Sequence, residues 1–423
     1  MAPVSSPILV GLSGGLDSSV LLHWLAEQPT VRTQGLRALH VHHGLHPEAD
    51  QWAEHCRNLC QQLGLDFEIA RVDVRHTLGL GPEAAARDAR HAAFSKHLHA
   101  GEVLALAHHR DDQAETVLLR LLRGSGSEGL AAMRDTRPFA AGKLWRPLLN
   151  SSRAELLDYA NVHSLNWIED PSNQDTRLDR NFLRHRVLPV LAERWPHAAA
   201  ALAQSARWLE EDATLLEGEA LCRLREVVGS APNTLSVPAL LALDPAWRSR
   251  VLRCWRRSLD FSPWPESAHA VIEAQLLTAR RDALPEYRWP GGILRRWREL
   301  IYIERLRPSL PEEWCCDWDG RAALELPTGD SLVLVGSGSA AEKYRVASRV
   351  GGERIQLPGR DHSHSLKHIL QAQGIPPWER ARMPLLFAAD GELLAAGNSL
   401  LSARWLRETS MLNGRLHWQR QHD

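Results

Sequence analysis

The chain has 423 residues, of which 44% are hydrophobic and 24% charged, with a formal net charge of −1. This composition is that of a globular protein and excludes a disordered or collagen-like chain. The length predicts about three domains of roughly 150 residues each. The sequence lacks the run of about 18 apolar residues that a membrane helix needs, and its first residues lack a signal-peptide pattern. We therefore expect a cytoplasmic protein with no membrane partner.

The basic residues are unevenly distributed and are almost all arginines. Residues 177–423 carry 34 basic and 30 acidic side chains, whereas residues 1–176 carry 16 and 21. Of the 50 basic residues 46 are Arg, whose guanidinium grips phosphate by two parallel hydrogen bonds. The six cysteines include no C-x-x-C pair, so the sequence predicts neither a zinc knuckle nor a redox pair. Charge alone does not identify a nucleic-acid partner.

The first 162 residues alternate between strand-like and helix-like segments. The strand-like segments are 8–12, 36–41, 67–72, 103–107 and 144–148, and the helix-like segments are 18–27, 48–63, 82–99, 111–123 and 152–162. This alternation is typical of an α/β fold, with a parallel sheet covered by helices on both faces. Ligands of such sheets bind at the carboxyl ends of the strands, so we expect the chemistry just after each strand.

The pattern changes after this region. Further helices are predicted at 179–195, 197–228, 238–259 and 267–279, and a flexible linker at 336–341. Residues 342–423 mix strand-like pieces with one helix near 366–373. We therefore predict a catalytic α/β domain over 1–194, a mainly helical middle domain over 195–335, and a small α+β C-terminal domain over 336–423.

The strongest motif is a Gly-rich loop between the first strand and the first helix. It consists of Ser13, Gly14, Gly15, Leu16, Asp17 and Ser18. The glycines let an anion approach the backbone, and the helix N-terminus adds free N–H groups and a positive dipole end. The loop lacks the Gly-Lys-Ser/Thr of a Walker A motif, which indicates chemistry other than γ-phosphate transfer. Because Asp17 would repel an anion, we expect Mg²⁺ between the two.

The loop resembles the pyrophosphate-binding loop of the ATP pyrophosphatases, which cleave ATP between the α and β phosphates. Further stretches make the chain similar to the tRNA(Ile)-lysidine synthetases. They are HVHHGL at 40–45, LAHHRDDQAET at 106–116, WIEDPSN at 167–173 and RNFLR at 180–184. Matching segments at 81–90 and 366–386 extend the resemblance over nearly the whole chain. It implies a PP-loop fold, like that of the adenine-nucleotide α-hydrolases, for the N-terminal domain.

The resemblance implies an ATP-dependent ligase that acts on tRNA(Ile) with a CAU anticodon. The wobble cytidine attacks the α-phosphorus of ATP, and pyrophosphate leaves. The ε-amine of free L-lysine then displaces AMP and forms lysidine, which pairs with A rather than G and so changes codon recognition to AUA. The implied cofactors are ATP and Mg²⁺, the implied partners are tRNA(Ile) and L-lysine, and a homodimer is left open.

The same resemblance assigns roles near the strand ends. The loop 13–18 and His40 would bind ATP, with Asp17 also catalytic. Asp112 and Glu115 lie three residues apart, and therefore on one helical face. They would bind the lysine ammonium or accept a proton from the amine. Acidic residues also favour helix N-termini in any protein, so charge complementarity with the helix dipole is the alternative.

Four basic residues are candidate substrate contacts. Arg87 either pairs with Glu83 one turn away or reaches a phosphate. Arg180 and Arg184 share one helical face of an Arg-rich stretch, and we expect them to contact the RNA backbone, although a solvated face has the same pattern. Lys367 is expected to contact tRNA phosphates from the C-terminal domain. The histidines at 40–46 lack the spacing of a zinc site, so no protein metal site is predicted.

Three alternative functions remain open. A tRNA thiolase with the same loop would need reactive thiols or an iron–sulfur cluster, and the sequence shows no suitable cysteine pair. An amidating synthetase would need an ammonia source and would leave the basic C-terminal half unexplained. A non-catalytic RNA-binding protein predicts that replacing Asp17, Asp112 or Glu115 leaves function intact.

Overall fold

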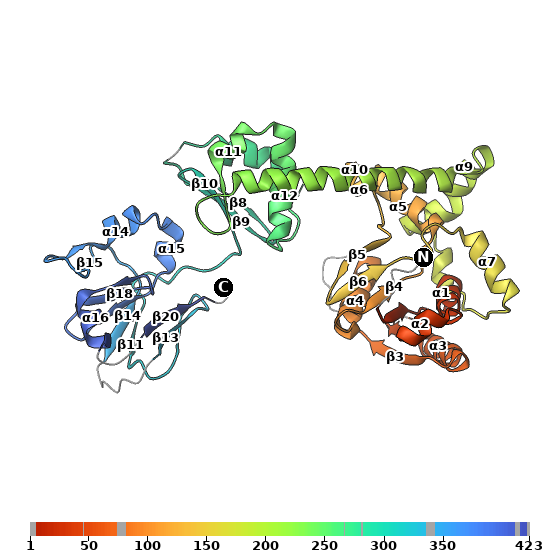
Figure 1. Ribbon diagram of the computed structural model, residues 1–423, viewed down its shortest axis with the longest axis horizontal. Helices are drawn as coiled ribbons and strands as arrows, with labels where there is room; N and C mark the ends of the chain where they lie inside the picture. Colours follow the sequence, from red (N-terminus) through yellow and green to blue (C-terminus); the bar gives the residue numbers. More distant parts are fainter. Residues whose placement is uncertain are drawn as a thin grey trace. The chain divides into compact units, whose positions relative to one another are not determined.

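The computed structural model describes residues 6–44, 46–73, 82–265, 267–280, 282–335, 343–410 and 415–420. Its contacts divide the chain into two compact units, Met1–Glu219 and Ala220–Asp423 (Figure 1). The predicted linker at 336–341 lies outside the described residues. The division into three domains at 194/195 and 335/336 stays a prediction.

The first unit is built on a six-stranded sheet in the order β3-β2-β1-β4-β6-β5. The strands are β1 (Ile8–Gly11), β2 (Leu36–His42), β3 (Asp66–Arg71), β4 (Val103–Ala105), β5 (Thr136–Phe139) and β6 (Gly142–Trp145). All neighbours pair in parallel except β5, which forms an antiparallel hairpin with β6 at the edge. The predicted parallel sheet is confirmed. The edge strand β5 was not predicted, because Pro138 interrupts its pattern and is tolerated only at a sheet edge.

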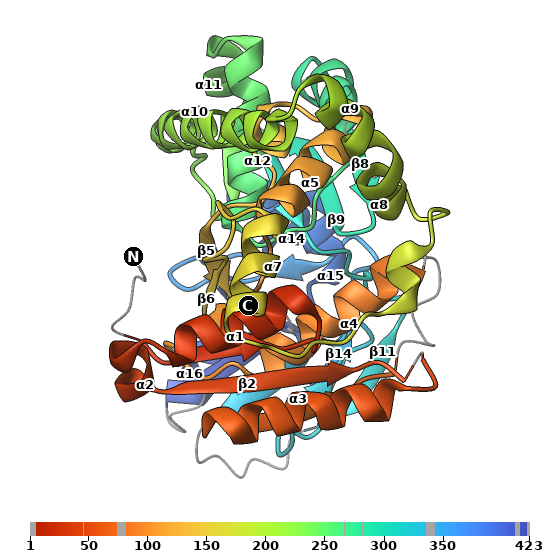
Figure 2. The same ribbon diagram turned by 90° about the vertical axis from the view of Figure 1, so that its right-hand side faces the viewer.

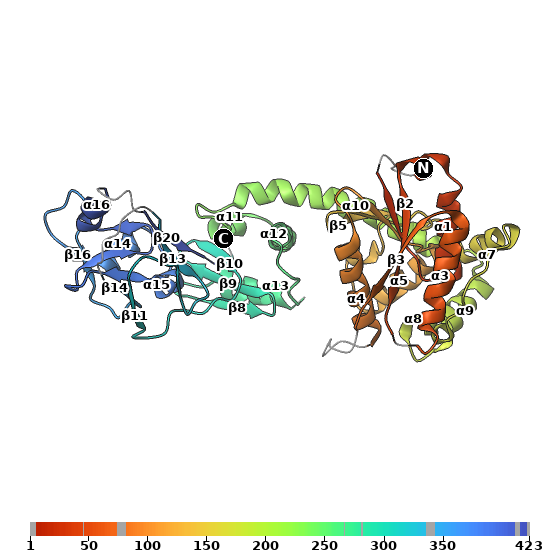
Figure 3. The same cartoon turned by 90° about the horizontal axis from the view of Figure 1, so that it is seen from below.

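Helices cover both faces of this sheet. Successive side chains of β1 point to opposite faces and are apolar on both, so each face needs a covering layer. Ile8 and Val10 belong to a core formed with α1, α3 and α7, whereas Leu9 belongs to a second core formed with α4. Figure 3 shows α3 and α4 on opposite sides of the strands. The helices are α1 (Leu16–Ala26), α2 (Pro29–Gln34), α3 (Ala49–Leu63), α4 (Pro82–His97), α5 (Arg110–Leu122), α6 (Ser127–Leu130) and α7 (Arg153–Val162).

The predicted Arg-rich helix at 179–195 is present but is not uniform. It consists of α8 (Asp179–Phe182), a π-helical turn (Leu183–Val187) and α9 (Leu188–Arg194). Pro189 cannot donate a backbone hydrogen bond, so the regular ladder cannot run through this point. The helix α8 packs against α5 (Figure 2), which brings the Arg-rich stretch to the carboxyl end of β4. The long α10 (Ala198–Val227) follows, and the boundary between the units falls within it.

The second unit begins with the predicted helical region, which also contains an unpredicted antiparallel sheet. Its strands lie in the order β7 (Thr234–Ser236), β10 (Leu300–Glu304), β9 (Gly292–Trp297) and β8 (Glu286–Trp289). The helices are α11 (Val237–Ala242), α12 (Pro245–Ser258) and α13 (Ala268–Val271), the last continued by a π-helical turn (Ile272–Leu277). The sheet escaped prediction because its strands are short and interleaved with arginines, which obscures the alternation.

The C-terminal region is a β-rich module with one core. Its sheets are β11-β14-β17-β18-β19, β12-β13-β20 and β15-β16. The strands are β11 (Cys315–Trp318), β12 (Leu324–Glu325), β13 (Ser331–Val335), β14 (Tyr344–Ala347), β15 (Arg354–Ile355), β16 (His364–Ser365), β17 (Leu385–Phe387), β18 (Leu393–Ala396), β19 (Leu400–Leu401) and β20 (Arg415–Gln419). The helices are α14 (Leu366–Ala372), α15 (Pro377–Arg382) and α16 (Ala403–Ser410). Strands β11 and β13 precede residue 336 yet pair with strands that follow it, so this module uses sequence on both sides of the predicted boundary.

The predicted helix near 366–373 corresponds to α14, whereas α15 and α16 were not predicted. Among the described residues, no helix combines the length and apolar character needed to cross a membrane.

Candidate active site

The Gly-rich loop after β1 is held closed by its own serines. The Ser18 hydroxyl accepts a hydrogen bond from the Ser13 N–H at 3.1 Å and donates one to the Gly15 carbonyl at 3.1 Å. The Gly14 carbonyl accepts a hydrogen bond from the Ile168 N–H at 2.9 Å, which ties the loop to the WIEDPSN stretch. The loop is therefore preformed, with Gly15 as the N-cap of α1. Its backbone and the free N–H groups of α1 suit a phosphate.

Gly14 has the backbone conformation that only glycine adopts readily, with a φ of +87°. A Cβ atom there would lie 3.0 Å from Cys56 Sγ and 3.1 Å from Ile168 Cδ1. We expect Gly14→Ala to displace the loop and raise the KM for ATP about 10- to 100-fold, since small misplacements at a reacting centre have effects of this size. Steady-state kinetics at varied ATP would measure this.

Gly64→Ala is the matched control for that experiment. Gly64 ends α3 with a φ of +65°, and a Cβ atom there would meet no neighbour within 4 Å. The substitution therefore adds similar backbone strain away from the loop, and the KM for ATP should stay at the wild-type value. Equal KM values for Gly14→Ala and the wild type would contradict the assignment of this loop to ATP.

Asp17, in the first turn of α1, has the features of a Mg²⁺ ligand. Its Oδ1 atom is buried and has no hydrogen-bond partner among the described residues. Burial raises the pKa of Asp17 above its ordinary value, while the nearby His109 opposes that rise. Carboxylate oxygens suit Mg²⁺, which keeps several waters and commonly binds phosphates as well. The described residues include no group of three or more His, Cys, Asp or Glu side chains that could hold a metal without other ligands. A Mg²⁺ ion here would therefore be bound by Asp17 together with phosphate oxygens and water.

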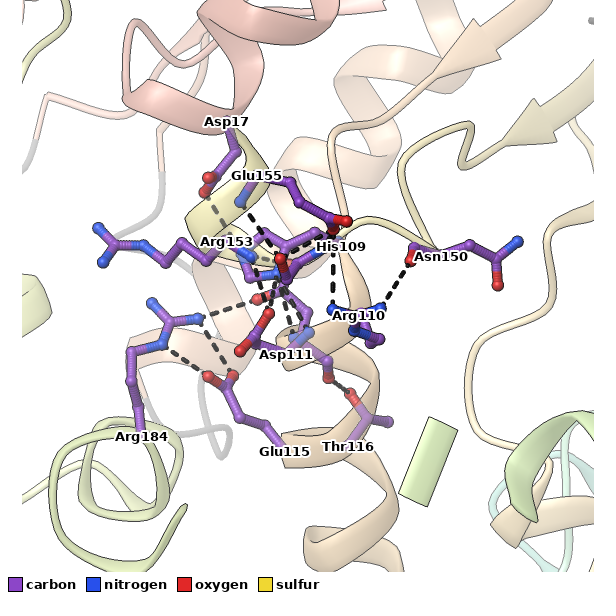
Figure 4. Close-up of polar contacts among 12 residues, drawn as sticks. Asp17, His109, Arg110, Asp111, Glu115, Thr116, Asn150, Arg153, Glu155 and Arg184 are labelled. Carbon is purple, nitrogen blue, oxygen red and sulfur yellow. Dashed lines mark hydrogen bonds and ion pairs between the residues drawn. The ribbon is translucent and has the colours of Figure 1, made fainter. Parts of the chain in front are cut away.

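His109 connects Asp17 with the acidic helix α5. Its side chain is fully buried at the N-cap of α5, where Nδ1 accepts hydrogen bonds from the backbone N–H groups of Asp111 and Asp112. Its Nε2 lies 3.7 Å from Asp17 Oδ2 (Figure 4). The same Nε2 lies 3.5 Å from Asp112 Oδ2. Burial lowers the pKa of His109, but the three surrounding carboxylates outweigh it and raise the pKa above its ordinary value. Because Nδ1 accepts hydrogen bonds from the start of α5, the ring proton lies on Nε2, which faces Asp17 and Asp112.

Asp112 and Glu115 lie together, as predicted, and both bind Arg180 and Arg184. Arg180 donates to Glu115 at 2.6 Å and to Asp112 at 3.0 Å. Arg184 donates to Glu115 at 2.6 Å (Figure 4) and to Asp112 at 2.9 Å. The Glu115 side chain has no exposed surface, and that of Asp112 is 12% exposed. We call these four residues the carboxylate–arginine cluster.

The charges of the carboxylate–arginine cluster stabilise one another. Burial raises the pKa of Asp112, but the charges of His109 and Arg180 outweigh it and hold this pKa below its ordinary value. Burial lowers the pKa values of Arg180 and Arg184, and the two carboxylates raise them above their usual range. Asp112, Arg180 and Arg184 therefore favour their charged forms. Two buried carboxylates and two guanidiniums are complementary to a small zwitterion.

The arrangement of Arg180 and Arg184 differs from the expected solvated or RNA-facing surface. Their side chains are only about one quarter exposed and are turned towards the two carboxylates. Their predicted contact with the RNA backbone stays a prediction. Sequence analysis placed both arginines on one helical face but missed the pairing, because the partners are 65 to 72 residues away along the chain.

The other predicted site residues, His40, Arg87 and Lys367, lie outside the carboxylate–arginine cluster. His40 is buried beneath the loop, and its Nδ1 donates to the Leu12 carbonyl at 2.9 Å. Burial lowers the pKa of His40, so the ring is neutral and supports the loop from below. Arg87 is exposed on α4, and Lys367 lies on α14 of the second unit, in a shallow cavity shared with Trp297 and Arg380. The side chain of Glu83 lies outside the described residues.

Comparisons with known proteins find similarity over nearly the whole chain. Residues 3–191 match a family described as a PP-loop domain, residues 235–302 a TilS substrate binding domain, and residues 344–418 a TilS substrate C-terminal domain. The tRNA(Ile)-lysidine synthase of Xanthomonas axonopodis pv. citri is 50% identical over 95% of this chain and 92% of that protein.

The chain is also similar to a second relative and to one solved domain. The tRNA(Ile)-lysidine synthase of Xylella fastidiosa is 51% identical over 98% of this chain and 95% of that protein. A solved TILS C-terminal domain matches with 22% identity and a TM-score of 0.20, covering 26% of this chain and 98% of that domain. With half of its residues identical over almost its full length, the chain belongs to the tRNA(Ile)-lysidine synthase family.

Proposed function

We propose that the protein ligates free L-lysine to the wobble cytidine of tRNA(Ile) with a CAU anticodon, at the expense of ATP. The product is lysidine, which changes codon recognition to AUA and amino-acid identity to isoleucine. The observation that carries this proposal is the full-length identity of about 50% to proteins named for this activity. The site supports it, because a preformed phosphate loop and a zwitterion-binding cluster are joined by one buried histidine.

The first half-reaction uses the Gly-rich loop. Residues 13–18 hold the polyphosphate while the cytidine oxygen attacks the α-phosphorus and pyrophosphate leaves. Mg²⁺, when bound at Asp17, supplies positive charge to the leaving pyrophosphate. The N–H groups at the start of α1 stabilise the same negative charge without any rearrangement of the loop. His40 supports the loop through Leu12, and its proposed contact with ATP follows from the family resemblance.

The second half-reaction uses the carboxylate–arginine cluster. Asp112 and Glu115 attract the ammonium group of lysine, and Arg180 and Arg184 balance the carboxylates and can meet the lysine carboxylate. The lowered pKa of Asp112 suits it to holding a cation rather than to keeping a proton taken from the amine. The neutral ε-amine then attacks the activated ring carbon of the cytosine, and AMP leaves with its bond to the base broken.

The wider assignments follow from the same proposal. Lys367, on the C-terminal module, contacts tRNA phosphates, and the protein acts in the cytoplasm, where tRNA, ATP and free lysine are all present. The proposed chemistry uses residues of one chain and does not require a second copy. A homodimer therefore stays a prediction.

Incorporation of labelled lysine into tRNA tests the proposed function. Purified protein would be incubated with ATP, Mg²⁺ and a CAU-anticodon tRNA(Ile) transcript, and AMP and pyrophosphate would be quantified alongside lysine. We expect one AMP and one pyrophosphate per lysine incorporated, and no incorporation into a transcript whose wobble base is U. Cleavage of ATP without lysine transfer would contradict the choice of nucleophile, and absence of any ATP cleavage would contradict the reaction class.

A further inference from the structure

Four arginines converge beside the carboxylate–arginine cluster, at the edge of the sheet where β6 ends. Arg87 belongs to α4, Arg120 to α5 and Arg137 to β5, and Arg146 follows β6 directly. In the β5–β6 hairpin Arg137 lies opposite Leu144, two residues before Arg146, and the Arg146 N–H donates to the Asp135 carbonyl at 2.8 Å. His91, one turn after Arg87 on α4, contacts Phe139 of β5 with 5.7 Å between the ring centroids. The side chains of Arg120 and Arg146 donate to the carbonyls of Ala132 and Arg134, which are two residues apart in the chain. We call these four residues the arginine pocket.

The arginine pocket is partly removed from water and is poorly neutralised. Arg146 is 5% exposed; its Nε donates to His108 Nδ1 at 3.2 Å and its Nη1 to the Arg134 carbonyl at 2.6 Å. Arg120 donates to the carbonyls of Gly129 and Ala132. These acceptors are all uncharged. Burial, with the charge of Arg146 acting in the same direction, lowers the pKa of His108 to about 3, so His108 is neutral.

Within the described part of the chain, none of the four arginines forms an ion pair with a carboxylate, and the charges of Asp135 and Glu210 reach Arg146 without contact. Burial, and then the charges of Arg137 and Arg87, lower the pKa of Arg146 to about 10. Gathering like charges away from water costs free energy unless an anion binds among them. The arginine pocket therefore has the character of an anion site.

The location of the arginine pocket limits which anion it receives. Arg146 holds His108, and the adjacent His109 contacts both Asp17 and Asp112, so the pocket borders the site where the two half-reactions meet. The ATP polyphosphate already has the loop at 13–18, and the lysine carboxylate has Arg180 and Arg184. The remaining anion of the proposed reaction is the phosphodiester backbone next to the reacting cytidine. Arg is the side chain best suited to grip it.

We propose that Arg87, Arg120, Arg137 and Arg146 bind a backbone phosphate of the tRNA anticodon loop and so hold the wobble cytidine beside the two half-sites. This inference rests on the proposed function, because it takes tRNA as the polyanionic substrate. It assigns to Arg87 the phosphate contact that the sequence left open against a pair with Glu83. It also places RNA-binding charge in the N-terminal unit, which carries more acidic than basic residues over 1–176.

The test is tRNA affinity measured at several salt concentrations for Arg87→Gln/Arg137→Gln. These two arginines are chosen because Arg120 and Arg146 also bind backbone carbonyls or His108, so their loss would disturb the fold. We expect the Kd for the tRNA(Ile) transcript to rise about tenfold or more, the size of a missing charge-assisted hydrogen bond. The slope of log Kd against log salt should fall by about 0.7 for each phosphate that the variant no longer binds. The KM values for ATP and lysine at saturating tRNA should not change.

Arg57→Gln and Arg137→Lys provide the controls. Arg57 is exposed on α3, where it pairs with Glu54, so its replacement should leave the Kd and the salt slope unchanged. Arg137→Lys keeps the charge and should retain the salt slope. Removing one of several like charges should not lower the melting temperature, and Arg137→Gln alone tests the same contact if the double variant melts early.

An unchanged Kd and salt slope in the double variant would overturn the inference, as would a raised KM for ATP or lysine with normal tRNA affinity. The proposed function is judged separately, by lysine incorporation in the wild type. A wild-type protein that incorporates lysine while the double variant binds tRNA normally would refute the arginine pocket alone. A wild type that binds tRNA but transfers no lysine would refute the proposed function alone.

Discussion

Asp112→Asn is expected to stop lysine transfer while the tRNA is still adenylated. The Asn side chain keeps the size of Asp112 but removes the negative charge that faces Arg180 and Arg184. The cluster would then carry an excess of positive charge and would repel the lysine ammonium. We expect lysine incorporation to fall about 100-fold or more, because a buried charged partner is left uncompensated. Labelled AMP should accumulate on the tRNA instead of being released.

The matched control for this experiment is Asp66→Asn. Asp66 is exposed at the start of β3, in the same sheet and away from the carboxyl ends of the strands. It should transfer lysine at the wild-type rate. If Asp112→Asn lost adenylation together with lysine transfer, Asp112 would belong to the nucleotide site, and the proposed separation of the two half-reactions would be wrong.

Asp17→Asn is expected to stop the reaction one step earlier. The unpartnered Oδ1 of Asp17 is the described atom best placed to hold Mg²⁺ near the loop, and an amide binds this ion far more weakly than a carboxylate. We expect release of pyrophosphate and adenylation of tRNA to fall about 100-fold or more, since the charge on the leaving group is no longer balanced. Raising the Mg²⁺ concentration should recover part of the activity.

Pyrophosphate release at a series of Mg²⁺ concentrations measures this effect. The wild type should lose activity when the metal is chelated, and the tRNA affinity of Asp17→Asn should be close to normal, which shows that the fold is retained. Normal adenylation by Asp17→Asn, with an unchanged dependence on Mg²⁺, would exclude Asp17 as the metal ligand.

The sequence predicted the parts of the fold that local patterns determine. The alternation of apolar strands and helices predicted the parallel sheet, and the position of Gly14 and Asp17 directly after β1 predicted the phosphate loop. The edge strand β5 and the sheet of the second unit were missed. A proline within β5, and arginines between the apolar residues of β9, conceal the periodicity that reveals a strand.

The partners within the site were harder to predict because they depend on tertiary contacts. Helical spacing placed Arg180 and Arg184 on one face, but only the packing of α8 against α5 shows that this face meets Asp112 and Glu115. The role of His109 as the link between Asp17 and Asp112 was missed for the same reason. The available signal was a histidine, His109, that Arg110 separates from two acidic residues at a strand end.

Transfer of the AMP group to tRNA in the absence of lysine tests whether the cytidine is adenylated before lysine attacks it. Wild-type protein would be mixed with α-phosphorus-labelled ATP, Mg²⁺ and CAU-anticodon tRNA(Ile), and the label on the RNA would be followed before and after lysine is added. We expect label to appear on the tRNA without lysine, and to leave as AMP when lysine is incorporated in equal amount. Label that never joins the RNA, while ATP is cleaved and lysine is incorporated, would contradict the adenylated cytidine and the two-site account built on it.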